Sequence, residues 1–161
     1  MTENAKGRIL IADDNQVNQE LLEAFLVGGG YEIEFASDGI ETLEKVSTFK
    51  PDVILLDIMM PKLSGFEVCE TLKKSISTQS IMILMVTALS DLGDIERAVA
   101  AGCDDYLSKP VHKLELLKRV ENMIKLRNVS NELERLRQYI DSIEDSLSPA
   151  EKPNPDTEKE A

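Results

Sequence analysis

The chain has 161 residues, with 30 acidic and 18 basic side chains and a formal net charge of −12. This length suits one domain with an appendage, and the acidity disfavours nucleic acid and anionic lipid as direct partners. The first residues carry no apolar signal segment, and no apolar run approaches the ~20 residues of a membrane span. Cys69 and Cys103 lack the spacing of a zinc site or a disulfide framework. We therefore expect a cytoplasmic protein with no membrane partner.

Short apolar runs alternate with amphipathic stretches along most of the chain. The pattern predicts strands over Arg8–Ala12, Tyr31–Phe35, Val53–Leu56, Ile81–Thr87 and Asp105–Ser108. Helices are predicted over residues 16–27, from 37–39 to about 48, over 65–74 and 91–101, and from 113 onward. In the first helix we expect Leu21, Leu22, Phe25 and Leu26 to share one apolar face.

Five strand–helix units predict an α/β fold, because parallel strands need crossover connections and these place helices on both faces of the sheet. The first, third and fourth strands are apolar almost throughout, as central strands are, whereas Tyr31–Phe35 alternates like an edge strand. These features favour a five-stranded, doubly wound, flavodoxin-like sheet with the order 2-1-3-4-5. That order leaves a crevice between the carboxyl ends of the first and third strands.

Polar side chains follow several of the predicted strands. Asp13 and Asp14 follow the first strand, Asp57 follows the third, Thr87 ends the fourth and Lys109 follows the fifth. In a parallel sheet these ends lie at one edge, so we expect the side chains to converge. Each aspartate alone could be an ordinary strand-end or helix-capping residue, but the whole set indicates a site.

Three neighbouring carboxylates repel one another, so the site needs a cation. Its ligands are oxygen atoms without histidine or cysteine, which favours Mg²⁺ or Mn²⁺ over zinc. A metal, an ammonium and a hydroxyl together suit phosphoryl transfer, and a carboxylate can be the nucleophile. Asp57, being central, is the best candidate nucleophile, and Asp13 and Asp14 are better placed to hold the metal.

The segments "LIADDN", "DVILLDIMMPKLSGFEV", "ILMVTAL" and "AGCDDYLSKP", in this order, closely resemble a response-regulator receiver domain of two-component signalling. The resemblance covers roughly Arg8 to Leu126. It implies that Asp57 accepts a phosphoryl group from a histidine kinase or a phosphotransfer protein. It also implies that Asp14 and Asp57 ligate Mg²⁺ directly, that Asp13 acts largely through water, and that the backbone carbonyl of Met59 is a further ligand.

By the same resemblance, Lys109 contacts the phosphoryl oxygens and Thr87 moves to hydrogen-bond one of them. Tyr106 is the coupled aromatic switch, and the Lys109–Pro110 peptide bond is cis. The implied outcome is a changed surface over the fourth helix, fifth strand and fifth helix, which signals to an unknown downstream protein or output domain.

The end of the last predicted helix carries a heptad pattern. The a positions are Leu126, Leu133, Ile140 and Leu147, and the d positions are Val129, Leu136 and Ile143. Glu132 at g and Arg137 at the next e favour a parallel homodimer, although a single helix folding back on its own domain is the alternative. We therefore predict a receiver domain over 1–125, a coiled-coil extension over 126–147 and a disordered tail over 148–161.

Two other classes of protein share parts of this pattern. A phosphatase of the haloacid-dehalogenase type would need a second aspartate two residues after the nucleophile, where this chain has Met59. A phosphorylation-independent scaffold would not need the complete set of site residues. We therefore expect a signalling receiver and not an enzyme acting on an external substrate; whether it works alone or as part of a longer protein stays open.

Overall fold

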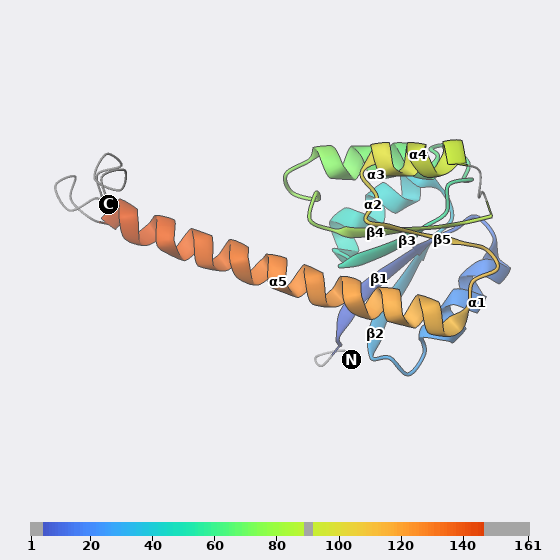
Figure 1. Ribbon diagram of the computed structural model, residues 1–161, viewed down its shortest axis with the longest axis horizontal. Coiled ribbons are helices and arrows are strands. Elements are labelled where there is room, and N and C mark those ends of the chain that lie inside the picture. The colour runs from blue at the N-terminus through green and yellow to red at the C-terminus, as the bar shows by residue number, and fades with distance from the viewer. Residues whose placement is uncertain (1–4, 89–91, 147–161) are drawn as a thin grey trace. The chain divides into compact units, whose positions relative to one another are not determined.

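The computed structural model describes residues 5–88 and 92–146. Five parallel strands form one sheet in the order β2-β1-β3-β4-β5, as predicted (Figure 1). The strands are β1 (Gly7–Ala12), β2 (Tyr31–Ala36), β3 (Val53–Leu56), β4 (Met82–Thr87) and β5 (Asp105–Ser108). The helices are α1 (Gln16–Leu26), α2 (Gly39–Phe49), α3 (Gly65–Lys74), α4 (Leu92–Ala101) and α5 (Lys113–Ser146). The predicted α/β fold is confirmed.

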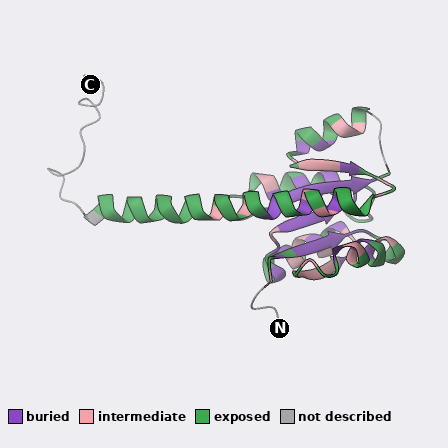
Figure 2. Ribbon diagram, turned by 60° about the horizontal axis from the view of Figure 1, so that its bottom comes forward, coloured by how far each residue is buried: buried purple, intermediate pink, exposed green. Residues whose placement is uncertain are grey.

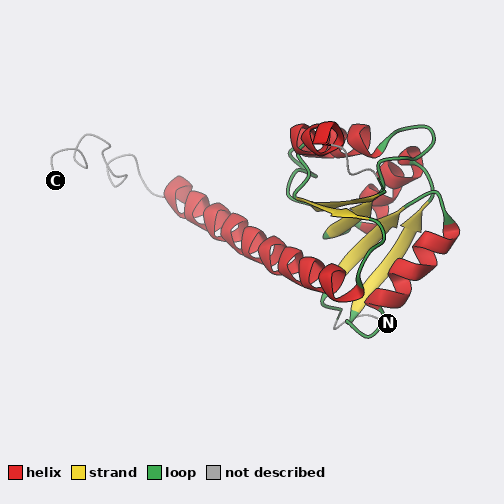
Figure 3. Cartoon of the chain, turned by 45° about the vertical axis from the view of Figure 1, so that its right-hand side comes forward, coloured by secondary structure: helices red, strands yellow, loops and turns green. Residues whose placement is uncertain are grey.

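Each face of the sheet carries its own apolar core, because successive side chains of a strand point to opposite faces. Ile54 and Leu56 of β3 pack with α2, α3 and α4, whereas Val53 and Leu55 pack with α1 and α5. Figure 3 shows helices on both sides of the strands. The central strands are buried on both faces, which is why their sequences are apolar throughout.

Side chains cap the first three helices and thereby fix where each begins. Asn15 accepts hydrogen bonds from two backbone N–H groups of α1, Asp38 caps α2, and Ser64 forms a capping box with Glu67. These caps follow β1, β2 and the loop after β3. They therefore hold the helix starts at the same edge of the sheet as the strand ends.

The buried face of α1 differs from the predicted one. Gln19, Leu22 and Leu26 are its buried residues, and Leu21 is 46% exposed. Positions 19, 22 and 26 form one stripe at helical spacing, while position 21 lies about 100° around the helix from position 22. Assigning Leu21 to the buried face was therefore wrong, and the polar Gln19 takes part in that face.

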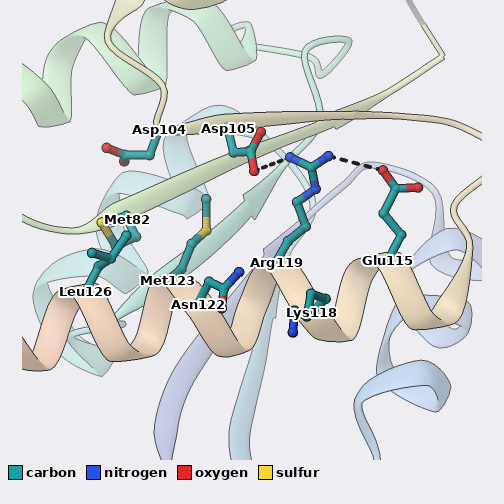
Figure 4. Close-up of a pocket in the computed structure, with 9 residues that line it drawn as sticks. All are labelled: Met82, Asp104, Asp105, Glu115, Lys118, Arg119, Asn122, Met123 and Leu126. Atoms are coloured by element: carbon teal, nitrogen blue, oxygen red, sulfur yellow. Dashed lines mark hydrogen bonds and ion pairs between the residues drawn. The ribbon is translucent and has the colours of Figure 1, made fainter.

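The described residues divide into two compact units, with the boundary between Arg127 and Asn128. In the first unit α5 buries Leu116, Val120, Met123 and Ile124. Arg119, on the same stretch of α5, bridges Asp105 and Glu115 beside a groove of about 520 Å³ (Figure 4). These contacts make the first part of α5 an integral layer of the fold.

The remaining turns of α5 consist almost entirely of exposed residues (Figure 2). The six predicted seam residues in the described part of the chain are between 42% and 62% exposed: Leu126, Val129, Leu133, Leu136, Ile140 and Ile143. Leu147 and the predicted tail over 148–161 lie outside the described residues. Pairing of this seam with a second helix stays a prediction. Among residues 5–88 and 92–146, no helix has the length and apolarity to span a membrane.

Candidate functional site

The ends of β1 and β3 bring three aspartates together. The two strands pair in parallel with Ala12 opposite Leu56, so the residues that follow them, Asp13 and Asp57, are neighbours. The backbone N–H of Asp57 donates to the carbonyl of Ala12 over 2.9 Å, which continues the ladder to the site. Carboxylate oxygens of Asp13, Asp14 and Asp57 lie within 4.8 Å of one another.

Lys109 reaches this cluster from the loop that follows β5. Its Nζ donates to Oδ2 of Asp13 over 3.0 Å and to Oδ2 of Asp57 over 3.1 Å. Its backbone N–H donates to the carbonyl of Thr87 over 2.8 Å, which ties the loop to the end of β4. The Lys109–Pro110 peptide bond is cis.

The cluster is largely removed from water and holds more negative than positive charge. Asp13 is only 2% exposed and Asp57 7% exposed, whereas Asp14 faces solvent. Burial by itself lowers the pKa of Lys109, but hydrogen bonds to Asp13 and Asp57 and the charges of both carboxylates outweigh burial and raise it. Lys109 is therefore a fixed positive charge, and it balances only one of the three carboxylates.

Backbone and side-chain groups hold the two buried aspartates in place. Oδ1 of Asp57 accepts the N–H of Met59 over 3.2 Å, and Oδ1 of Asp13 accepts the N–H of Asn15 over 2.9 Å. The amide of Gln19 donates to the backbone carbonyl of Asp13 over 2.6 Å. Sequence reasoning missed Gln19; the signal available was a polar residue in register with Leu22 and Leu26.

Gly65 at the start of α3 permits the close packing behind Asp57. A Cβ at this position would lie 2.4 Å from the backbone carbonyl oxygen of Asp57 and 2.8 Å from the Cα of Ile58. Both neighbours are backbone atoms that cannot turn away. The glycine of the "LSGF" segment therefore belongs to the structural support of the site.

Thr87 is linked directly to a residue of the aspartate cluster site, whereas Tyr106 packs in the neighbouring apolar core. Thr87 is 1% exposed at the end of β4 and is joined to Lys109 through the backbone. Tyr106 packs instead against the core on the α3 and α4 face, beside Cys103. Its hydroxyl is buried and has no hydrogen-bond partner among the described residues. Burial raises the pKa of Tyr106, and the charge of Asp94 adds to this effect.

The donor set fits a hard divalent cation. Asp13, Asp14 and Asp57 offer only oxygen atoms, and the single positive charge of Lys109 leaves the cluster with an excess of negative charge. Mg²⁺ prefers such ligands and commonly uses one or two carboxylates together with phosphate oxygens and water. Met59, whose backbone carbonyl is the expected further ligand, lies two residues after Asp57 and is 64% exposed.

This fold, with an acidic cluster at the carboxyl ends of β1 and β3, defines the class of the protein. The response regulator receiver domain family matches residues 9–121. The chain therefore belongs to the response regulator receiver domain family.

The chain matches only part of two response regulators. The response regulator PleD of Caulobacter vibrioides is 39% identical over 127 residues, which are 79% of this chain and 28% of PleD. The response regulator MprA of Mycobacterium leprae is 40% identical over 118 residues, covering 73% of this chain and 51% of MprA. The chain thus matches between about a quarter and a half of the length of these relatives.

A solved receiver structure matches about three quarters of this chain. The receiver domain of sensor histidine kinase PA1611 from Pseudomonas aeruginosa PAO1 is 32% identical, with a TM-score of 0.69 over 74% of this chain and 98% of that chain. That structure has a magnesium ion coordinated in its active-site cleft. A second likeness, to the CheY-like receiver domain protein of Methanospirillum hungatei JF-1, has a TM-score of 0.71 at 29% identity, over 76% of this chain and 97% of that chain.

Proposed function

We propose that this chain is a phosphorylation-activated response regulator in which Asp57 accepts a phosphoryl group from a histidine kinase or a phosphotransfer protein. The observation that carries the proposal is the bridge from Lys109 to two buried carboxylates, beside a third, at the ends of adjacent strands. An ordinary capping role needs neither the shared ammonium nor the excess negative charge.

In the proposed reaction a carboxylate oxygen of Asp57 attacks the phosphorus atom of the donor. The bond between phosphorus and the donor's histidine nitrogen breaks, and that nitrogen retains the electron pair. Asp13, Asp14, Asp57 and the carbonyl of Met59 would hold Mg²⁺, which when bound neutralises charge on the phosphoryl oxygens. Lys109 contributes a second positive charge on the side of Asp13 and Asp57, where its Nζ already lies.

The signal would spread from the hydroxyl of Thr87. Thr87 moves to hydrogen-bond a phosphoryl oxygen, and Tyr106 follows into the space that it leaves. The buried, unpaired hydroxyl of Tyr106 supports two positions for this ring, because an unsatisfied polar group favours movement to a partner. The result is a changed surface over α4, β5 and α5, which a downstream protein or an output domain recognises.

The extension would act as the second part of the signal. Its exposed seam has heptad spacing, and Glu132 and Arg137 occupy positions that favour a parallel pair of identical helices. A seam of about three heptads gives a weak dimer, so the state of the receiver can change its population. We propose a second copy of this chain as the partner.

The acceptor is tested by mass spectrometry of the intact chain with acetyl phosphate and Mg²⁺. We expect one phosphoryl group on the wild type, with acetate as the leaving group, and none on Asp57→Asn or after chelation of the metal. Asp52→Asn, which alters an aspartate at the opposite end of β3, is the matched control and should be modified like the wild type. Modification of Asp57→Asn would contradict the assignment. No uptake by the wild type would favour the phosphorylation-independent scaffold.

A further inference from the structure

A second charged cluster lies where α5 leaves the first unit, at the amino ends of the strands. Nε of Arg127 lies 3.6 Å from Oδ1 of Asp52, and its guanidinium also donates to the hydroxyl of Ser80. Asp52 directly precedes β3, and its Oδ2 accepts the backbone N–H of Arg8 over 2.9 Å. We call Arg127, Asp52 and Ser80 the base clamp.

The apolar packing next to Arg127 fixes the same stretch of helix. Ile124, one turn earlier on α5, is 7% exposed, and a Cβ on Gly7 would lie 2.4 Å from its Cδ1. The start of β1 and the end of this helical segment are thus in close contact. Arg127 is the last residue of the first unit, and the predicted seam begins beside it at Leu126 and Val129.

In the base clamp Arg127 contacts both Asp52 and Ser80, but one of its hydrogen-bond donors has no acceptor among the described residues. The Arg127 side chain is 18% exposed, yet its Nε is buried and forms no hydrogen bond with the described residues. A cavity of about 620 Å³ lies alongside, lined by Arg127 together with Lys50, Pro51 and Ile81. The Nε–H group of Arg127 therefore lacks a hydrogen-bond acceptor in the described part of the chain, and the neighbouring cavity leaves room for the guanidinium to move. A second position of the guanidinium is thus available.

The strand β3 joins the base clamp to the acceptor. Asp52 precedes its four residues and Asp57 follows them, and all four are at most 1% exposed. At about 3.3 Å per residue, the two aspartates are roughly 16 Å apart along a strand packed on both faces. One strand thus carries the acceptor at one end and the carboxylate that holds the root of the extension at the other.

We propose that the base clamp couples the receiver to its extension: Arg127 on Asp52 and Ser80 holds the helix where the seam begins, so the state of Asp57 alters dimer affinity only while the clamp is intact. This inference rests on the proposed function, since it takes phosphoryl uptake at Asp57 and pairing of the seam as its input and output. Arg127 is a positioning residue and contacts neither reactant.

The test uses the full chain with Arg127→Met, Asp52→Asn and the conservative Arg127→Lys. Lys125→Met is the matched control, because Lys125 lies two residues away and its partner within residues 5–88 and 92–146 is Glu121, in an exposed ion pair. Sedimentation equilibrium gives the dimer dissociation constant with and without acetyl phosphate and Mg²⁺. We expect a change of at least tenfold in wild type and Lys125→Met, less than threefold in Arg127→Met and Asp52→Asn, and partial recovery in Arg127→Lys.

Phosphoryl uptake at Asp57, followed by mass, should be the same in all variants, which separates lost coupling from a damaged site. A full dissociation-constant change in Arg127→Met would overturn the inference and leave the proposed function intact. A wild type that takes up the phosphoryl group without any change in dimer affinity would overturn the coupling while keeping Asp57 as acceptor.

Amide hydrogen exchange tests the clamp without phosphorylation or dimers, at protein concentrations where the chain is monomeric. Arg127→Met should exchange at least tenfold faster over residues 120–127 than wild type, with unchanged protection in β3 and β4. Equal protection over 120–127 in the two chains would overturn the clamp, whatever happens at Asp57.

Discussion

The two ends of the sheet carry the same kinds of side chain in different proportions. At the amino ends of the strands, Arg8 pairs with Glu32 and Arg127 with Asp52, so two cations meet two carboxylates. At the carboxyl ends, the single ammonium of Lys109 lies among three carboxylates. Each of these two ion pairs is electrically balanced, whereas the aspartate cluster at the carboxyl ends has an excess of negative charge.

This difference explains why the carboxyl ends of the strands are suited to binding a cation and the amino ends to structural ion pairs. A balanced, partly exposed ion pair has little to gain from a further ion, and each pair contributes only about 0–1 kcal/mol. An unbalanced cluster with two nearly buried carboxylates is unfavourable until a cation binds. The apolar strands between the two ends keep their charges apart.

The largest effect expected from this comparison is stabilisation of the chain by Mg²⁺. Binding to the folded state alone adds about 2.7 kcal/mol to the free energy of unfolding at a hundredfold excess over the dissociation constant. Urea unfolding with Mg²⁺ and with a chelator measures the gain. Asp14→Asn should reduce it by more than half, because Asp14 is a solvent-facing member of the cluster and Lys109 does not contact it.

Asp52→Asn is the control for the magnesium experiment, since it removes a carboxylate from a balanced ion pair at the amino ends. It should leave the gain from Mg²⁺ unchanged. If Asp52→Asn reduced the gain as much as Asp14→Asn, the metal would not be bound at the carboxyl ends of the strands.

A smaller change in the free energy of unfolding is expected when an aspartate is replaced by asparagine at one end or at the other, in separate variants without metal. Asp52→Asn removes the charge that Arg127 faces and should lower the free energy of unfolding by about 1 kcal/mol. Asp57→Asn removes one of three repelling carboxylates while Asp13 keeps Lys109, so it should leave stability unchanged or raise it. Equal losses from both substitutions would remove the electrostatic distinction between the ends.

The residues at the carboxyl ends of the strands could be predicted from the sequence better than those at the amino ends, for a physical reason. Asp13 and Asp57 directly follow apolar strands and Lys109 directly follows β5, and the parallel topology then places the three residues together. Strand order follows from which strands are apolar throughout, so the fold and the convergence of these residues could both be anticipated.

The contacts of Gln19 and Arg127 depend on helix rotation and on side-chain reach, which local patterns do not encode. Gln19 was overlooked because the apolar Leu21, two residues later, was assigned to the buried face, whereas Leu21 is exposed and Gln19 is buried. Arg127 lies in a stretch where charged residues usually cover an exposed helix, and its partner Asp52 is 75 positions earlier in the chain. Long-range pairs of this kind emerge only when the helix is placed on the sheet.

The smallest effect concerns a balanced pair at the site end of the sheet, Asp38 with Lys62. The pKa of Asp38 is lowered chiefly because its carboxylate accepts the backbone N–H of Glu41, with a further contribution from Lys62. A folded pKa below the unfolded one means that this stabilisation is complete above about pH 4 and is lost as the pH falls through the folded value.

Asp38→Asn keeps a capping oxygen but does not titrate, so its stability should lack this part of the acid decline. Urea midpoints of wild type and Asp38→Asn, compared from pH 7 to about pH 3, should differ most at neutral pH and converge as Asp38 is protonated. Mg²⁺ should leave that difference unaltered, because a balanced pair outside the aspartate cluster gains nothing from the cation. A difference that grew with Mg²⁺ would extend the unbalanced region to the start of α2 and weaken the division of charge between the two ends.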